Sequence, residues 1–245
     1  MSPASKAIAI IAGVGPGTGA ACARRFATTY PVVLLARKPE NYEPLVAEIN
    51  KAGGHAMGVS TDVSSEDSVR AALQKVQAEH KDAACAAAIF NASGPFSRKP
   101  LLEMTPAEFE QSWQVSCKGA LIFAQATLPL LLNHNGERPP TLIFTGATAS
   151  IKANAQMSSF ASSKHALRAL STSIAKEFAP KGVHVAHAVI DGVIDIPRTK
   201  EWLKDMPAEA KIGAEDIAES YWNLHCQSRR CFTNEIDVRP MLEKW

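Results

Sequence analysis

The chain has 245 residues, of which 46% are apolar and 20% charged, and its formal net charge is +2. These proportions exclude a disordered chain, and the scattered basic residues exclude nucleic acid and anionic membranes as expected partners. The five cysteines are odd in number and follow no ligand spacing, so we expect free thiols, a reducing cytoplasmic location and no metal site.

Short apolar runs alternate with longer segments of helical periodicity along most of the chain. The apolar runs predict strands at Ala7–Ile11, Val32–Ala36, Ala56–Ser60, Ala84–Phe90, Leu142–Thr145 and Val183–Ile190. The periodic segments predict helices at Thr18–Thr29, Pro44–Ala52, Glu66–His80, Pro106–Leu132 and Ser159–Ala179. Because nearly continuous apolar strands alternate with helices, we expect a doubly wound α/β fold around a parallel sheet, in one domain over residues 1–245.

Two segments depart from this alternation. Residues 195–214 have weak periodicity, several charges and two prolines, and we predict a substrate-binding flap within the domain. The apolar run Leu121–Leu132 is shorter than the ~20 residues that a membrane span needs, so we expect no membrane segment.

A glycine-rich turn directly follows the first predicted strand and leads into the first predicted helix. It reads Ala12-Gly13-Val14-Gly15-Pro16-Gly17-Thr18-Gly19. A dinucleotide diphosphate needs a backbone that it can approach closely and the free amides of a helix N-terminus. The order strand, glycine turn, helix therefore favours nucleotide binding over a tight turn without a ligand.

The spacing Gly13-x-x-x-Gly17-x-Gly19 resembles the TGxxxGxG motif of the short-chain dehydrogenase/reductase family, with Ala12 at the threonine position. Further matches follow in chain order: Asp62-Val63, Asn91-Ala92-Ser93-Gly94, Ser163-Lys164, and Asp191-Gly192 where Pro-Gly is usual. The resemblance implies a Rossmann-type fold and a nicotinamide cofactor. It also implies that Gly15 and Thr18 border the diphosphate, that Asp62 and Val63 hold the adenine, and that Asn91, Ala92, Lys164, Gly192, Val193 and Ile194 lie along the ribose and nicotinamide.

The end of the second predicted strand indicates which nicotinamide cofactor binds. Arg37 and Lys38 stand there, and no acidic residue occurs before Glu40. An acidic side chain at this place holds the ribose hydroxyls of NAD, whereas a cation accommodates the additional phosphate of NADP. We therefore expect NADP(H) rather than NAD(H), with Arg37 at the phosphate, although Arg37 could also be a solvated surface residue.

The catalytic residues depart most from the family pattern. Members of the family protonate the substrate through a tyrosine four residues before Lys164, and Phe160 occupies that position here. Ala147 aligns with the usual serine, or Thr148 after a shift of one residue, and Ser116 aligns with the usual asparagine. Of the four usual side chains only Lys164 remains, and it also contacts the ribose in the family.

Several functions remain open at this stage. We expect an oxidoreductase acting on a small-molecule carbonyl or alcohol, with the proton supplied by Thr148, Ser159, Asp195 or a water held by Lys164. Alternatives are a nucleotide-binding sensor or scaffold without turnover, and a non-redox isomerase or lyase on the same fold. The resemblance also implies a homodimer or homotetramer formed through the helices around Trp113 and in 159–179.

Overall fold

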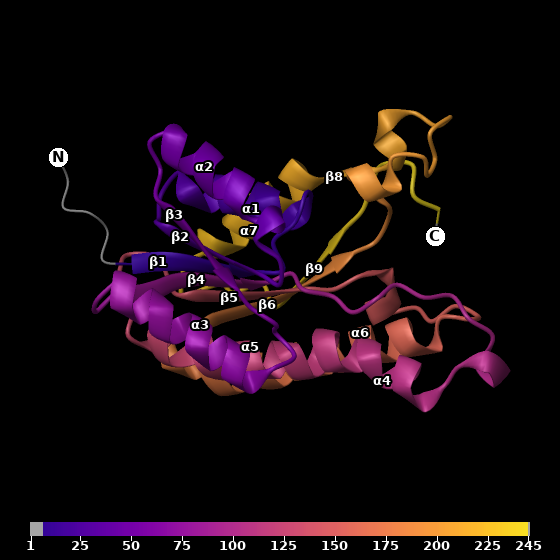
Figure 1. Ribbon diagram of the computed structural model, residues 1–245, viewed down its shortest axis with the longest axis horizontal. Helices are drawn as coiled ribbons and strands as arrows, with labels where there is room; N and C mark the ends of the chain where they lie inside the picture. Colours follow the sequence, from indigo (N-terminus) through magenta and orange to yellow (C-terminus); the bar gives the residue numbers. More distant parts are fainter. Residues whose placement is uncertain (1–6, 245) are drawn as a thin grey trace.

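The computed structural model describes residues 7–244, and its centre is a seven-stranded parallel sheet (Figure 1). Its strand order is β3-β2-β1-β4-β5-β6-β9, and every neighbouring pair is parallel. The strands are β1 Ala7–Ala12, β2 Val32–Ala36, β3 Ala56–Ser60, β4 Ala84–Phe90, β5 Thr141–Thr145, β6 His184–Ile190 and β9 Glu235–Val238. The predicted single-domain, Rossmann-type doubly wound fold is confirmed.

Helices cover both faces of the sheet (Figure 1). One face carries α1 Thr18–Ala27, α2 Glu43–Lys51 and α7 Ala214–His225; the other carries α3 Glu66–Glu79, α4 Pro106–Trp113, α5 Gly119–Leu132 and α6 Ser158–Phe178. Successive side chains of a strand point to opposite faces. Accordingly Ala9 and Ile11 of β1 pack in the core beneath α1 and α7, whereas Ile8 and Ile10 pack in the core beneath α3 and α5.

The strand order reverses between β1 and β4, which are neighbours in the sheet with Ala12 opposite Phe90. Ligands of open α/β sheets bind outside the carboxyl ends of the strands at such a reversal. The glycine turn follows β1 at this point and Asn91 follows β4, so the fold brings two sequence-predicted segments to one edge.

The long helix predicted at Pro106–Leu132 is interrupted. A π-helical turn at Gln114–Lys118 separates α4 from α5, and the buried Ser116 lies in this turn. By length and composition, the combined segment is the one described helix apolar enough to cross a membrane. More than half of its most apolar window is buried, and α5 packs on β4 in the core, so it is the core helix of a soluble fold.

Two elements near the end of the chain were not predicted. Helix α7 buries Ile217, Tyr221 and Leu224 against the sheet, although its sequence mixes these residues with charges. Strand β9 has only four residues and alternates exposed Glu235 and Asp237 with partly buried neighbours, which is a pattern typical of an edge strand. The main sheet therefore has seven strands instead of the six that were predicted, and the additional strand is the edge strand β9.

The predicted flap, residues 195–214, is closed at its base by a short parallel ladder. Strand β7 (Ile194–Asp195) pairs with β8 (Ile212–Gly213). Short 3₁₀ turns at Pro197–Thr199 and Ala208–Ala210 lie between them. The backbone N–H of Leu242 donates to the carbonyl of Glu209 at 3.1 Å, which ties the end of the described chain to this flap.

Candidate functional site

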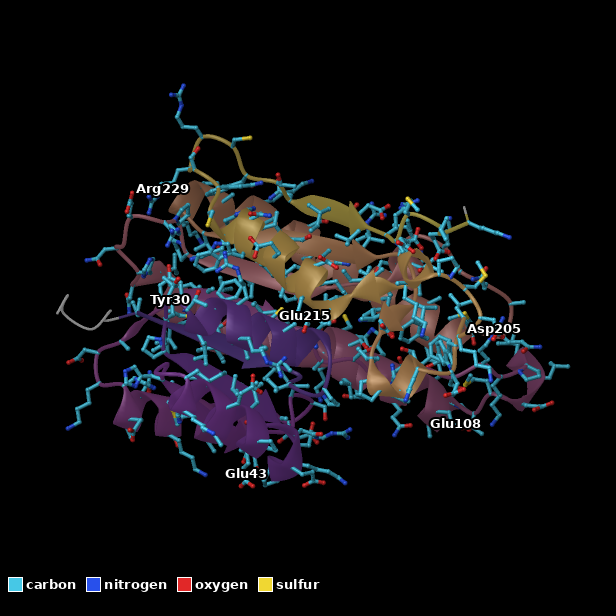
Figure 2. The ribbon with its side chains drawn as sticks, turned by 90° about the horizontal axis from the view of Figure 1, so that it is seen from above. Tyr30, Glu43, Glu108, Asp205, Glu215 and Arg229 are labelled. Atoms are coloured by element: carbon cyan, nitrogen blue, oxygen red, sulfur yellow. The ribbon has the colours of Figure 1, made fainter. Side chains whose placement is uncertain are left out.

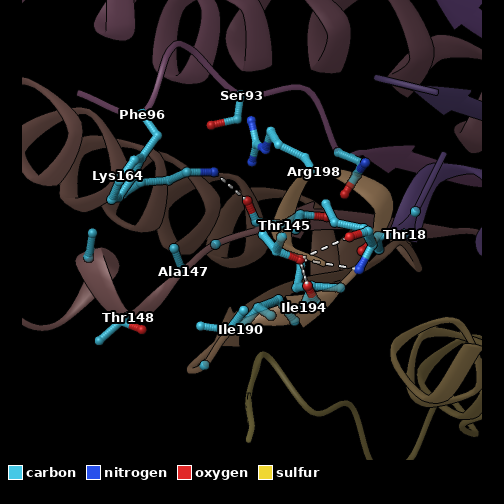
Figure 3. A pocket seen from close by; sticks show the side chains of 18 of the residues that line it. Thr18, Ser93, Phe96, Thr145, Ala147, Thr148, Lys164, Ile190, Ile194 and Arg198 are labelled. Carbon is cyan, nitrogen blue, oxygen red and sulfur yellow. Dashed lines mark hydrogen bonds between the residues drawn. The ribbon is translucent and has the colours of Figure 1, made fainter. Parts of the chain in front are cut away.

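A cavity of about 710 Å³ lies at the carboxyl ends of β1, β4, β5 and β6 (Figure 3). A second cavity of about 230 Å³ adjoins it where β2 and β3 end. Gly13, Asn91 and Ser93 line both cavities, so the two cavities adjoin along this edge of the sheet, and we call them together the groove.

The glycine turn forms one wall of the groove. Gly13 has a φ of +87°, and a Cβ on it would stand 2.3 Å from the backbone nitrogen of Ala92. A Cβ on Gly19 would stand 2.6 Å from the carbonyl oxygen of Gly13, because α1 begins in direct contact with the turn. These positions need glycine, since other residues strain at positive φ and carry an atom where there is no room.

Gly15 and Thr18 border the larger cavity. A Cβ on Gly15 would meet no atom within 4 Å, so this part of the turn faces open space. Thr18 is 6% exposed, and within residues 7–244 its buried Oγ1 has no hydrogen-bond partner. An unmet buried hydroxyl at the N-terminus of a helix is a ready contact for an anionic oxygen.

The smaller cavity is lined by Arg37, Asp62, Val63 and Ala92, which are four of the residues predicted to bind the cofactor. The Asp62 carboxylate accepts hydrogen bonds from the hydroxyl of Ser64 at 2.6 Å and from its N–H at 2.9 Å. The Ser64 hydroxyl lowers the pKa of Asp62, and the nearby Arg37 charge adds to this. Asp62 is thereby held as an oriented acceptor.

Asn91 and the π-helical turn fix the middle of the groove. Asn91 Nδ2 donates to the carbonyl of Gly13 at 2.9 Å and so ties the end of β4 to the glycine turn. Ser116 Oγ accepts the backbone N–H of Gly94 at 2.9 Å. The position aligned with the family's asparagine therefore holds the segment after β4 and does not line either cavity.

Lys164 lies in the first half of α6 and lines the larger cavity, although its residue is 2% exposed. Its Nζ donates to the carbonyl oxygen of Thr145 at 3.0 Å (Figure 3). Burial lowers the pKa of Lys164 to about 8, because the charged amine is desolvated. The amine is therefore poised to exchange a proton near neutral pH.

Two contacts support Lys164 from the end of the chain. The hydroxyl of Tyr221 in α7 donates to Thr145 Oγ1 at 2.9 Å. Arg168, one helical turn after Lys164, makes a two-pronged ion pair with Glu235 of β9 at 2.7 Å. These contacts tie both β5 and α6 to elements that the sequence did not predict.

The position predicted for the proton-donating tyrosine is apolar. Phe160 lines the larger cavity, with its ring centroid 5.9 Å from Lys164 Nζ. Its ring meets Phe96 edge-on at 5.3 Å, and Phe96 lies 6.2 Å from Trp202 of the flap. We call Phe96, Phe160 and Trp202 the aromatic wall.

The turn after β6 completes the cavity. Gly192, Val193 and Ile194, all predicted to lie near the cofactor, line it. Asp191, at the usual proline position, is buried and pairs with Arg239 at 3.4 Å. This ion pair holds the turn against the segment that follows β9.

The sequence model of the short chain dehydrogenase family matches residues 7–207 of the chain. The chain belongs to the short-chain dehydrogenase family. A short-chain dehydrogenase of Rhodopseudomonas palustris is 33% identical with a TM-score of 0.80, and the match covers 96% of this chain and 99% of that one. This chain is thus an oxidoreductase of the short-chain dehydrogenase type.

Two further relatives match over nearly their whole length. An uncharacterized oxidoreductase of Staphylococcus epidermidis is 25% identical over 244 residues, which are 98% of this chain and 100% of the relative. A metagenomic short-chain oxidoreductase, solved in complex with NADP, is 27% identical with a TM-score of 0.79 and covers 98% and 99% of the two chains.

Two of the predicted proton donors of this short-chain dehydrogenase lie outside the cavity. The Ser159 hydroxyl donates to the backbone carbonyls of Glu108 and Phe109 in α4. Ser159 precedes the cavity-lining Phe160 by one residue of the helix, which is a rotation of about 100°, so its side chain points toward α4 and not into the cavity. Asp195 is exposed and faces Lys211 at 3.4 Å. Thr148 does line the cavity, together with Ala147.

Some lining residues were not singled out from the sequence, among them Ser93, Phe96, Arg198 and Trp202. Ser93 stands within the Asn91–Gly94 segment, and that segment was the available signal. Arg198 and Trp202 belong to the predicted flap, residues 195–214, although the sequence did not indicate which flap side chains face the cavity. Phe96 comes from a loop whose place at the cavity depends on long-range packing, which no periodicity reports.

Proposed function

We propose that the protein is an NADP(H)-dependent oxidoreductase that reduces a small-molecule carbonyl or oxidises the corresponding alcohol. The observation that carries the proposal is the groove, in which Arg37 lines the smaller cavity and Lys164 lines the larger one. When bound, the nicotinamide supplies or accepts a hydride. The chain supplies the binding wall, the orientation and the proton.

The residues of the groove fit such a cofactor. The open space at Gly15 and the unpartnered hydroxyl of Thr18 suit a diphosphate at the start of α1. Asp62 and Val63 suit the adenine, since the carboxylate accepts hydrogen bonds and the neighbouring amide can donate one. Lys164 suits the ribose beside the nicotinamide, because its amine lines the cavity with donors beyond the one used by Thr145.

The choice of NADP(H) over NAD(H) rests on Arg37. The exposed guanidinium borders the smaller cavity, and no acidic side chain stands at the end of β2 among residues 36–39. Arginine pairs with phosphate through two parallel hydrogen bonds, which makes it suited to a ribose phosphate. The NADP complex of the 27% identical short-chain oxidoreductase supports the same choice.

The Arg37→Gln variant tests this choice. We expect wild-type protein to bind NADPH at least about tenfold more tightly than NADH, and Arg37→Gln to lose most of that preference by weakening NADPH alone. Titration of nucleotide fluorescence gives the four dissociation constants. Arg70→Gln, an exposed arginine of α3 outside both cavities, is the control. Equal wild-type affinities for NADPH and NADH would contradict the proposal.

We propose that Lys164 supplies the proton, directly or through a water that it holds. A buried amine with a pKa of about 8 carries a transferable proton at neutral pH. The Thr148 hydroxyl borders the same cavity and can complete the path, whereas an alcohol is a weak acid by itself. The pathway needs no tyrosine at position 160.

We also propose a cytoplasmic homodimer or homotetramer formed through α4 and α5. Large apolar side chains are exposed on these helices, namely Phe109, Trp113, Leu121 and Leu132. Covering such a surface stabilises an assembly. Sedimentation at micromolar concentration is expected to give a dimer or tetramer, and Leu121→Glu is expected to shift it toward monomer. A wild-type monomer alone would reject this assembly.

A further inference from the structure

The flap rests directly on the glycine turn. A Cβ on Gly17 would stand 2.7 Å from Ile196 Cγ2, so Ile196 covers the turn at the N-terminus of α1. Arg198 lies two residues further along the flap and lines the larger cavity. Figure 3 shows its guanidinium reaching into the cavity on the side of Ser93.

Arg198 has no hydrogen bond or ion pair with another residue in the described part of the chain. Two other cationic side chains line this cavity, but Lys164 donates to Thr145 and Lys152 belongs to the segment after β5. The carboxylate in the described lining, Glu243, lies beside Gly192 and makes no ion pair with Arg198. The guanidinium is thus available to a ligand.

The glycine turn and the start of α1, on which the flap rests, suit an anion but carry no full positive charge. The N-terminus of α1 offers backbone N–H dipoles, and the first turn of the helix contains no lysine or arginine. The buried, unpartnered Oγ1 of Thr18 borders the same space. A diphosphate has two negative charges, so dipoles and one hydroxyl leave it incompletely neutralised.

We propose that Arg198 binds the cofactor diphosphate from the flap side, so that nucleotide binding holds residues 195–214 closed over the glycine turn. The inference rests on the proposed nicotinamide nucleotide. Arg198 supplies the positive charge that the glycine turn lacks. The packing of Ile196 on Gly17 holds the flap, which carries Arg198, against the turn. The short ladder between β7 and β8 is the base about which the flap closes.

Ligands that contain different parts of the nucleotide test the contact. Arg198→Gln is expected to weaken NADPH and 2′-phospho-ADP-ribose by the same factor, about tenfold, because both contain the diphosphate. It is expected to leave 2′-AMP unchanged, because this ligand lacks the diphosphate and fits the smaller cavity. Lys200→Gln, an exposed neighbour that lines neither cavity, is expected to change none of the three dissociation constants.

Limited chymotrypsin digestion at Trp202 reports flap closure without an activity assay. Trp202 is 47% exposed, and neither variant removes this cleavage site. Saturating NADPH is expected to slow cleavage at Trp202 severalfold in wild type and Lys200→Gln but not in Arg198→Gln. Arg198→Lys, which keeps the charge, is expected to recover part of the protection.

Three results would overturn the inference while leaving the proposed function in place. They are unchanged NADPH affinity in Arg198→Gln, which would leave the guanidinium for an acidic substrate; an equal loss for 2′-AMP, which would indicate an indirect structural effect; and full protection of Trp202 in that variant. Failure of wild-type protein to bind NADPH would instead reject the proposed function itself.

Discussion

Replacing Phe160 with tyrosine is expected to raise carbonyl reduction by NADPH about 100-fold or more. The ring lines the cavity with its centroid 5.9 Å from Lys164 Nζ, so a phenol hydroxyl on it shares the cavity with the amine. The ammonium charge lowers the pKa of such a phenol, and a positioned general acid contributes a factor of ~10²–10⁴. The measurement is kcat/KM of native and variant protein over a panel of small aldehydes and ketones.

The matched control adds the same hydroxyl to the neighbouring ring. Phe96 packs edge-on against Phe160 and is 44% exposed, so Phe96→Tyr is expected to fold and to leave turnover within about twofold. Native protein that binds NADPH but turns over only after Phe160→Tyr would contradict the proposed redox role. The site would then serve as a nucleotide sensor or scaffold, or would run a non-redox reaction.

The Lys164→Met variant is expected to lose at least about 100-fold in turnover, because it removes the proposed proton source. In wild type, carbonyl reduction is expected to fall as pH rises through about 8, where the amine loses its proton. This limb of the pH profile is expected to disappear in the variant. Lys176→Met, an exposed lysine of the same helix, is the control. A variant that keeps both turnover and the limb would exclude Lys164.

The same substitution, Lys164→Met, is expected to raise the stability of the folded protein although it lowers turnover. Burial lowers the folded-state pKa of Lys164 from 10.5 to about 8, so below pH 8 its charge costs about 3 kcal/mol of folding free energy. Between pH 8 and 10.5 the unfolded chain binds more protons than the folded chain, so this cost diminishes as pH rises. Lys164→Met avoids the cost, and its advantage over wild type is expected to shrink from pH 7.5 to 10.5.

Urea unfolding of both proteins at the two pH values measures this difference. Lys176→Met again serves as control, since an exposed lysine pays no comparable desolvation cost. An advantage that stays constant with pH would mean that the effect comes from packing and that the amine titrates normally.

The central strands could be predicted because a strand that is buried on both faces consists of a continuous apolar run. Val32–Ala36 and Ala84–Phe90 have the predicted bounds for this reason. Strand β9 could not be predicted, since an edge strand needs few apolar residues and carries Glu235 and Asp237 on its exposed side. The π-helical turn at Gln114–Lys118 was also missed. One extra residue shifts a helical pattern by about 100°, but the sequence of α5 that follows is apolar on nearly all sides and does not reveal the shift.

The groove could be predicted where the backbone itself demands a residue type. Gly13 is required by its positive φ and Gly19 by close packing, and both requirements appear as glycines in the sequence. The orientation of Ser159 could not be inferred, since neighbouring positions of a helix differ by about 100° and the facing helix α4 decides which points inward. The flap at residues 195–214 was predicted, whereas the position of the Arg198 side chain within the cavity depends on how this long loop folds back, which the local sequence pattern does not report.

The family match ends at residue 207, yet two elements beyond it secure the Lys164 amine. The Tyr221 hydroxyl donates to the hydroxyl of Thr145, whose carbonyl oxygen accepts the hydrogen bond of the Lys164 amine. Glu235 forms an ion pair with Arg168 on α6, the helix that carries Lys164. A graft of residues 7–207 onto another scaffold would therefore transfer the proposed nucleotide groove without the two contacts that position Lys164, the proposed proton donor. A graft that is to keep the activity is expected to need the residues through the end of β9 as well.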